Sequence, residues 1–299
     1  MKSSKGLELF ENVELKKFTT FRIGGRARYF VKIYTISGLR DFLSFTNEEG
    51  IGYFILGAGS NILVRDGEIN DIVIVKLSGE FNRVEVCSGK ENNTTILTGS
   101  GFSLPALSKF ALDHSLKGAE FCVAIPGTIG GALVLNAGAH GSEIKDIVRK
   151  VYCFTKEGEE VVFSKDEITF SYRDSCLRDY IVTFAEFELK PCEYTKIKER
   201  MEENLRYRAN TQPRGFSAGS VFKNPDGFKA WKLIRDVGLA GYRIGDVMFS
   251  EKHANFIINL GNGKAEDVLR LIKLARQRVF EKFGILLEPE IKLLGLSLE

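Results

Sequence analysis

The chain has 299 residues, of which 44% are hydrophobic and 27% charged, a globular composition with room for two or three domains. The 42 basic and 39 acidic residues leave a net charge of +3, which is too small and too evenly mixed to indicate a nucleic-acid or membrane surface. The five cysteines form no C-x-x-C pair, so neither a disulfide framework nor a metal site is expected. No apolar run follows the basic start, and we expect a cytoplasmic protein without a leader.

The first third of the chain predicts one helix among short strands. A helix is expected over residues 37–46, because Leu39, Phe42 and Leu43 would share one face. Apolar runs rich in β-branched and aromatic residues predict strands at 53–56, 62–64 and 72–77.

The middle third mixes helices and strands. Ser103 is expected to cap a helix that tolerates Pro105 in its first turn. Strands are expected at 151–154, 161–163 and 181–189. A charged helix over 193–210 follows, and we interpret it as a linker between domains. The apolar face of this helix is expected to consist of Ile197, Met201 and Leu205.

The last third predicts a short helix over 228–237, ended by Gly238, and a long one over 265–283. Strands are expected at 255–260 and in the tail at 285–296. The mixed order of strands and helices indicates an α+β protein rather than a run of Rossmann-like units. The long helix places a set of apolar residues at helical spacing, which predicts core packing: Val268, Leu269, Ile272, Ala275, Val279 and Phe280.

Two glycine-rich loops could bind a diphosphate, because glycine lets backbone N–H groups approach an anion closely. The first loop is Gly57-Ala58-Gly59-Ser60-Asn61, and Ile62 stands where a Rossmann fingerprint needs glycine. The second is Pro126-Gly127-Thr128-Ile129-Gly130-Gly131, with Ala137-Gly138 shortly after it. It lies within residues 121–142, which hold no Asp, Glu, Lys or Arg and too many glycines for a spanning helix, so we expect a buried loop. Either loop alone could equally be a tight turn without a ligand.

Together the loops resemble the flavin domain shared by vanillyl-alcohol-oxidase-type enzymes and UDP-N-acetylenolpyruvoylglucosamine reductases. Further segments resemble the reductases specifically, and the similarity extends from about Asn12 to Leu294. These segments are Thr19–Gly25, Ser171–Ser175, Ser217–Pro225, Phe249–Phe256 and Leu287–Ile291. The resemblance implies a two-subdomain FAD-binding fold of the vanillyl-alcohol-oxidase type with a C-terminal α+β substrate domain. The expected boundaries are 1–78 (joined by a C-terminal strand, 286–299), 79–200 and 201–285.

The resemblance also implies the chemistry. Enzymes of this family bind FAD, here expected to be non-covalent, and use NADPH to reduce UDP-N-acetylglucosamine enolpyruvate to UDP-N-acetylmuramate for peptidoglycan synthesis. Hydride addition at C3 leaves negative charge at C2 that spreads into the carboxylate, so a cation and an acid beside it would stabilise that charge. By match to the family, Arg173 would bind the carboxylate and Glu290 would assist there. Ser220 would protonate C2.

The candidates for substrate binding rest on different kinds of match to the family. Tyr172, Arg214, Lys223 and Asn224 match or neighbour substrate positions of the family, and Lys252 is a further candidate for the substrate diphosphate. His140 stands where the family more usually has tyrosine, and the short region 225–249 indicates the compact subclass of the family.

Two rival functions stay open at this point. One is a flavin oxidase that tethers its cofactor through an early histidine, although none of His114, His140 and His253 lies in the first flavin segment. The other is a non-catalytic nucleotide-binding module, against which Arg173, Ser220 and Glu290 argue together. We expect a monomer.

Overall fold

The computed structural model describes residues 6–90 and 93–298, and contacts between Cα atoms divide the chain into two compact units. Unit 1 comprises Met1–Glu11, Tyr29–Ala58 and Asp71–Arg208, and unit 2 comprises Asn12–Arg28, Gly59–Asn70 and Ala209–Glu299. Residues 1–5, on which the expectation of no leader partly rests, lie outside the described residues. The three-part division expected from the sequence stays a prediction.

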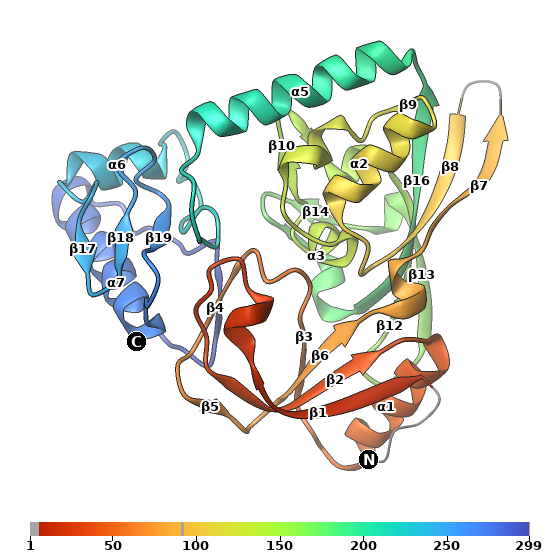
Figure 1. The fold of residues 1–299 in the computed structure, drawn as a ribbon, viewed down its shortest axis with the longest axis horizontal. Coiled ribbons are helices and arrows are strands. Elements are labelled where there is room, and N and C mark those ends of the chain that lie inside the picture. The colour runs from red at the N-terminus through yellow and green to blue at the C-terminus, as the bar shows by residue number, and fades with distance from the viewer. Residues whose placement is uncertain (1–5, 91–92, 299) are drawn as a thin grey trace. The chain divides into compact units, whose positions relative to one another are not determined.

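A mainly parallel sheet covered by one helix opens the fold (Figure 1). Its strand order is β1-β2-β6-β3, with β5 beside β2. Leu39, Phe42 and Leu43 of the helix are buried against strand residues, which confirms the predicted helix and its apolar face. The elements are β1 (Leu7–Glu14), β2 (Arg26–Ile33), α1 (Ile36–Glu48), β3 (Tyr53–Ile55), β5 (Glu68–Ile69) and β6 (Val73–Leu77).

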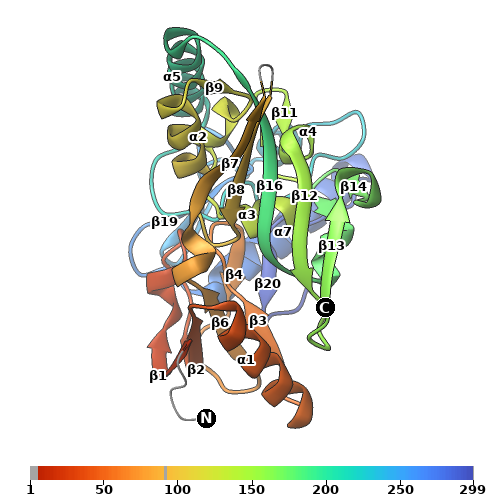
Figure 2. The same ribbon diagram turned by 90° about the vertical axis from the view of Figure 1, so that its right-hand side faces the viewer.

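An antiparallel sheet forms the second layer of unit 1, with strand order β13-β12-β16-β8-β7, and Figure 2 shows these strands side by side. The central strand β16 includes the strand predicted at 181–189, and it buries alternate residues from Ile181 to Leu189. The short β9 pairs with its end. The strands are β7 (Val84–Lys90), β8 (Asn93–Gly99), β9 (Leu116–Lys117), β12 (Val148–Phe154), β13 (Glu160–Ser164) and β16 (Ile181–Pro191).

Short helices pack against this second sheet and share its hydrophobic core. Ser103 Oγ accepts from the N–H of Ala106 and Pro105 stands in the first turn, so the predicted cap is confirmed. The uncharged stretch predicted as a loop instead contains a short helix and a hairpin. No helix in the described ranges is long and apolar enough to cross a membrane. The elements are α2 (Leu104–Asp113), α3 (Ile129–Val134), β10 (Gly138–Ala139), β11 (Ser142–Glu143) and α4 (Ile144–Ile147).

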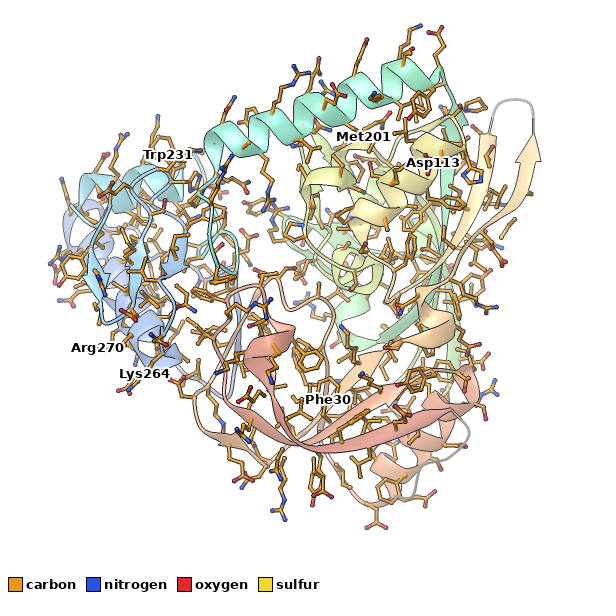
Figure 3. The ribbon with its side chains drawn as sticks, viewed as in Figure 1. Phe30, Asp113, Met201, Trp231, Lys264 and Arg270 are labelled. Atoms are coloured by element: carbon orange, nitrogen blue, oxygen red, sulfur yellow. The ribbon has the colours of Figure 1, made fainter. Side chains whose placement is uncertain are left out.

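Helix α5 (Tyr194–Thr211) uses part of its expected apolar face. Ile197 and Met201 are buried with Leu112 of α2, and Figure 3 shows Met201 on the side of α5 turned toward α2. Leu205 is 45% exposed, so its assignment to this face was wrong. Steps of four residues drift by about 40° around a helix, and Asn204, one step of three after Met201, occupies the buried face instead.

Unit 2 folds around two helices and a three-stranded antiparallel sheet, ordered β17-β18-β19. Gly238, with φ 73°, follows the first helix as predicted, and Gly284, with φ 68°, ends the second. Phe280 is 55% exposed, so its assignment to the core was wrong, whereas Leu271 is fully buried. The elements are α6 (Ala230–Asp236), β17 (Arg243–Ile244), β18 (Val247–Phe249), β19 (Ile257–Asn259) and α7 (Ala265–Phe283).

Two distant segments complete unit 2. Strand β20 (Lys292–Leu294) pairs in parallel with β4 (Ile62–Val64), which follows directly after the first glycine loop. Leu294 therefore lies beside Val64, and the C-terminal tail belongs to the same unit as this early strand. Short 3-10 helices connect several elements: η1 (Leu15–Phe18), η2 (Gly79–Asn82), η3 (Glu120–Ala124), η4 (Lys165–Glu167) and η5 (Cys176–Asp179).

Candidate active site

The two glycine-rich loops meet within unit 1. Strand β3 leads into Gly57 and Ala58, and a Cβ on Gly57 would lie 2.7 Å from Oγ1 of Thr128. Thr128 is in turn bridged to Ser103, and the N–H of Leu104 donates to the carbonyl of Gly127 (3.1 Å). Only glycine permits this approach, so the beginning of the first loop lies directly against the second loop.

Polar groups beside this junction suit an anionic ligand. Nζ of Lys76 donates to the carbonyl of Gly57 (2.9 Å), and burial, followed by the charge of Lys32, lowers the pKa of Lys76. The N–H of Gly130 donates to the carbonyl of Ser100 (2.8 Å). Oγ of Ser100 is buried without a hydrogen-bond partner among the described residues. Glycine loops with a half-buried cation and an unsatisfied hydroxyl fit a cofactor that carries a diphosphate.

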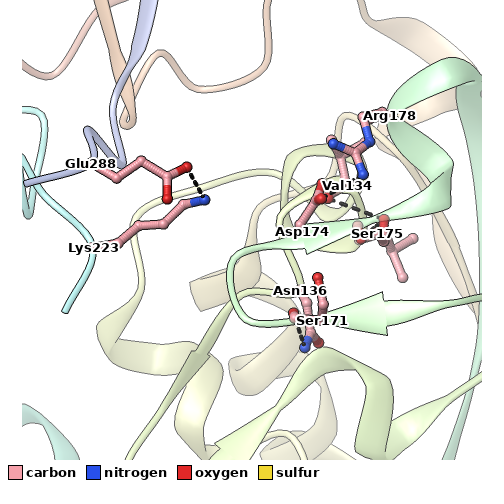
Figure 4. Close-up of polar contacts among 9 residues, drawn as sticks. Val134, Asn136, Ser171, Asp174, Ser175, Arg178, Lys223 and Glu288 are labelled. Atoms are coloured by element: carbon pink, nitrogen blue, oxygen red, sulfur yellow. Dashed lines mark hydrogen bonds and ion pairs between the residues drawn. The ribbon is translucent and has the colours of Figure 1, made fainter. Parts of the chain in front are cut away.

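Arg173 stands in the turn of a hairpin formed by β14 (Phe170–Ser171) and β15 (Asp174–Ser175). Its φ of 58° is uncommon for a residue other than glycine. Nδ2 of Asn136 donates to the carbonyl of Ser171 (3.1 Å), and Oγ of Ser175 donates to the carbonyl of Val134 (3.0 Å) (Figure 4). Both strands of the hairpin are therefore fixed to the end of α3, the helix that begins in the second glycine loop.

The surroundings of Arg173 in unit 1 include a carboxylate and an aromatic ring. Its guanidinium lies 5.2 Å from the ring centroid of Tyr172, a cation–π distance. Burial acts to raise the pKa of Glu143, but hydrogen bonds from Lys145 and Asn136 outweigh it, so the pKa is lowered. The positive charge of Arg173 acts in the same direction. The lowered pKa favours an ionised Glu143, whose negative charge attracts Arg173.

In unit 2, the segment from Ser217 to Pro225, called the serine segment below, lies between two other backbone segments. Ser220 forms a β-bridge with Phe256, and Val221 donates its N–H to the carbonyl of Asn255 (2.8 Å). On the other side, the carbonyl of Val221 accepts from the N–H of Glu290 (2.8 Å). Ser220 and Glu290, far apart in the sequence, therefore lie on neighbouring backbone segments.

Asn255 fixes this segment with its side chain as well. Oδ1 accepts from the N–H of Phe222 (2.9 Å), and Nδ2 donates to the carbonyl of Phe222 (2.8 Å). Both residues are at most 3% exposed, so water cannot replace these bonds. Next to them, the imidazole of His253 packs on Trp231 and Phe256, and its burial lowers its pKa.

The second half of the first glycine loop belongs to unit 2. Gly59 has φ 63°, and a Cβ there would collide with the carbonyl of Phe18, so glycine is required. Nδ2 of Asn61 donates to the carbonyl of Glu290 (3.1 Å). The loop is thus bonded to the backbone of a predicted catalytic residue.

The predicted substrate-binding residues have varied surroundings. Nζ of Lys223 pairs with Glu288 at 2.7 Å (Figure 4), and Oδ1 of Asn224 accepts from the N–H of Ala230 (3.0 Å). Tyr172 and Arg214 are exposed. Nζ of Lys252, the further candidate, donates to the carbonyl of Ala209 (2.6 Å), so its ammonium group already has a partner within the protein.

Three residues with structural roles at the site had no role assigned from the sequence. They are Thr20, Asn136 and Asn255, each of which lies inside a quoted motif or glycine-rich segment. A polar residue between apolar neighbours, as in Ala254-Asn255-Phe256, is the only local signal, and it does not reveal which backbone groups the side chain binds.

Comparison with known proteins decides the family. The family model described as UDP-N-acetylenolpyruvoylglucosamine reductase, C-terminal domain, matches residues 212–294, and the FAD binding domain model matches residues 27–164. The UDP-N-acetylenolpyruvoylglucosamine reductase of Clostridioides difficile (strain 630) is 42% identical over 284 residues, covering 94% of this chain and 91% of the relative. This chain belongs to the UDP-N-acetylenolpyruvoylglucosamine reductase family.

Other reductases of the family agree with this assignment. A relative from Caldanaerobacter subterraneus subsp. tengcongensis is 43% identical over 295 residues, covering 96% of this chain and 94% of the relative. The solved structure of the reductase from Thermus caldophilus superposes with a TM-score of 0.81 at 35% identity, covering 96% of this chain and 98% of that one. The predicted family, fold class and FAD cofactor are confirmed, and the oxidase alternative is wrong because the C-terminal reductase domain is present.

Proposed function

We propose that Arg173, Ser220 and Glu290 perform the substrate half of the reaction of this reductase family. The chain is an FAD-dependent oxidoreductase that reduces UDP-N-acetylglucosamine enolpyruvate to UDP-N-acetylmuramate with NADPH, a step of peptidoglycan precursor synthesis. When bound, FAD supplies the hydride chemistry between NADPH and the enolpyruvyl group. The remaining requirements are to bind the substrate carboxylate, to stabilise charge that develops beside it, and to deliver a proton to C2.

Arg173 binds the substrate carboxylate in this proposal. Charge spreads into that carboxylate during hydride addition, so a fixed cation stabilises the transition state more than the ground state. The anchored hairpin supports this role, because it fixes the backbone from which the guanidinium extends before substrate arrives. Glu290, in its protonated form, adds a hydrogen bond at the same carboxylate.

Ser220 donates the proton to C2. A neutral hydroxyl is a weak acid in water, but the carbanion is a strong base and needs only a positioned donor. The observation that supports this most is the hydrogen bond from the N–H of Glu290 to the carbonyl of Val221, which brings Ser220 and Glu290 onto neighbouring segments. A donor and an assisting acid fixed by one short segment need little rearrangement during the reaction.

The cofactor-binding residues are proposed from the two glycine loops, and the binding is non-covalent. Their backbone N–H groups would bind the diphosphate of FAD, with Lys76 adding a positive charge nearby. These residues are Gly57, Ala58, Gly59, Ser60, Asn61, Pro126, Gly127, Thr128, Gly130, Gly131, Ala137 and Gly138.

For the substrate, we propose that a phosphate group replaces the carboxylate of Glu288 as the partner of Lys223. An ion pair at this degree of exposure contributes little free energy, so a dianionic ligand can displace it. Asn224, Tyr172 and Arg214 are the other proposed substrate-binding residues. We further propose a monomer that acts in the cytoplasm, consistent with the small net charge and the five free cysteines.

The test of this proposal is Arg173→Met, which keeps aliphatic bulk and removes the charge. Loss of one such transition-state contact costs about 2.7–4 kcal/mol, or roughly a hundred- to a thousand-fold in kcat. The matched control is Arg178→Met, because Arg178 lies in the same region, is exposed and forms an ion pair with Asp174 (2.5 Å). Flavin content should stay unchanged in both variants. Equal activity of the two variants would contradict the role of Arg173.

A further inference from the structure

Both polar groups of the Glu290 backbone are held by other parts of unit 2. Its N–H donates to the carbonyl of Val221 (2.8 Å), and its carbonyl accepts from Nδ2 of Asn61 (3.1 Å). The carbonyl of Asn61 also accepts from the N–H of Lys292 (2.9 Å), where β20 begins. The backbone position of Glu290 therefore depends on a side chain of the first glycine loop.

The same loop is linked to the serine segment through Thr20. The N–H of Thr20 donates to the carbonyl of Gly59 (3.0 Å), and Oγ1 donates to the carbonyl of Ser217 (2.7 Å). Ser217 precedes Ser220 by three residues, and Gly219 between them has φ 81°. The hydroxyl of Thr20 therefore fixes the start of this turn.

We propose that Asn61 and Thr20 are positioning residues for the substrate half-reaction, holding Glu290 and the Ser220 turn in register with the flavin loop. The inference rests on the proposed roles of Ser220 and Glu290 and adds two residues that act through them. Neither side chain needs to contact the substrate. The backbone of the loop from Gly59 to Asn61 would then bind the cofactor. The side chain of Asn61 and the contact of the loop with Thr20 would position Glu290 and Ser220.

A positioning role predicts a specific division of effects. A displacement of about 1 Å at a reacting group can slow a reaction on the order of a hundred-fold. Reduction of the flavin by NADPH uses neither Ser220 nor Glu290 and should be insensitive to such a displacement. Loss of Asn61 or Thr20 should therefore slow the reoxidation of the flavin by the enolpyruvyl substrate more than its reduction.

The first experiment uses Asn61→Ala, which deletes the amide that donates to the carbonyl of Glu290 without adding charge to the loop. FAD affinity is measured by fluorescence titration of the apoprotein, and each half-reaction by stopped-flow absorbance. With the flavin site saturated with FAD, we expect reoxidation to slow roughly ten- to a hundred-fold more than flavin reduction does. Reoxidation at the wild-type rate in Asn61→Ala would overturn the proposal.

A double variant identifies the residue through which Asn61 acts. If Asn61 works by positioning Glu290, Asn61→Ala should add little further loss once Glu290→Gln is present. Losses that multiply would overturn the coupling. The single variant Glu290→Gln separates the two claims: if it reoxidises normally, the proposed role of Glu290 fails, whatever Asn61 does.

The second experiment uses a matched pair at Thr20. Thr20→Val preserves the size and the N–H that donates to Gly59 but removes the hydroxyl, whereas Thr20→Ser retains the hydroxyl. Thr20→Val should slow reoxidation selectively, and Thr20→Ser should recover most of the lost rate. A defect that merely loosens the fold or the flavin would slow both half-reactions equally, and that result in either experiment would overturn the proposal.

Discussion

Replacement of Asn255 by alanine should destabilise unit 2 strongly. The change removes two hydrogen bonds to the backbone of Phe222 and leaves a buried N–H and a buried carbonyl without partners. Each buried unsatisfied group costs about 1–3 kcal/mol, so the free energy of unfolding should fall by about 2–6 kcal/mol. The side chain is 3% exposed and Phe222 is 1% exposed, which prevents water from compensating.

The assay is urea unfolding followed by tryptophan fluorescence, because Trp231 is the only tryptophan and lies in unit 2. The matched control is Asn210→Ala on the exposed part of α5, which should change the free energy of unfolding by no more than about 0.5 kcal/mol. If Asn255→Ala loses less than about 1 kcal/mol, the side chain does not hold the serine segment as inferred. The activity of the folded fraction should also fall, since Ser220 lies two residues before Phe222.

Two further predictions concern the cofactor and pH. Acid or heat should release intact FAD into the supernatant, because the proposed loops bind it through backbone N–H groups and no covalent attachment is expected; colour retained on the denatured protein would contradict this. Burial lowers the pKa of His253 in the folded chain. When the pH falls below the ordinary histidine pKa of about 6.5, the unfolded chain therefore binds a proton at His253 more readily than the folded chain does. The thermal midpoint should therefore decrease as the pH is lowered from 7.5 to 5.5, and it should decrease less in His253→Phe. Parallel curves of midpoint against pH for both proteins would show that His253 does not contribute.

Much of the fold could be predicted from local patterns. Helix α7 lies at its expected residues, and β16 buries alternate residues from Ile181 to Leu189, because spacing alone determines which face is apolar. Errors arose at the margins of the apolar faces. Leu205 follows Ile197 and Met201 by repeated steps of four, which rotate away from the buried face, and Phe280 lies about 100° around the helix from the buried Val279.

The site was predictable only in part, because its geometry depends on contacts between distant segments. The motifs indicate Ser220 and Glu290 as candidates, but nothing local indicates that the carbonyl of Val221 joins their segments or that Asn61 binds the carbonyl of Glu290. The close approach of Gly57 to Thr128 likewise requires two loops separated by about seventy residues of chain. Family resemblance supplied the residues, and the structure supplies their hydrogen bonds.

The central claim is that Ser220 supplies the proton to C2 of the enolpyruvyl group, and the half-reactions of Ser220→Ala test it most directly. Stopped-flow absorbance of the flavin measures reduction by NADPH and reoxidation by UDP-N-acetylglucosamine enolpyruvate separately. Reduction should be nearly unchanged, and reoxidation should slow by about 10²–10⁴-fold, the loss expected for a general acid. Ser220→Cys, with a donor of similar reach, should recover part of the rate. Equal slowing of both half-reactions by Ser220→Ala would contradict the account, because the serine would then serve the cofactor or the fold rather than the proton transfer.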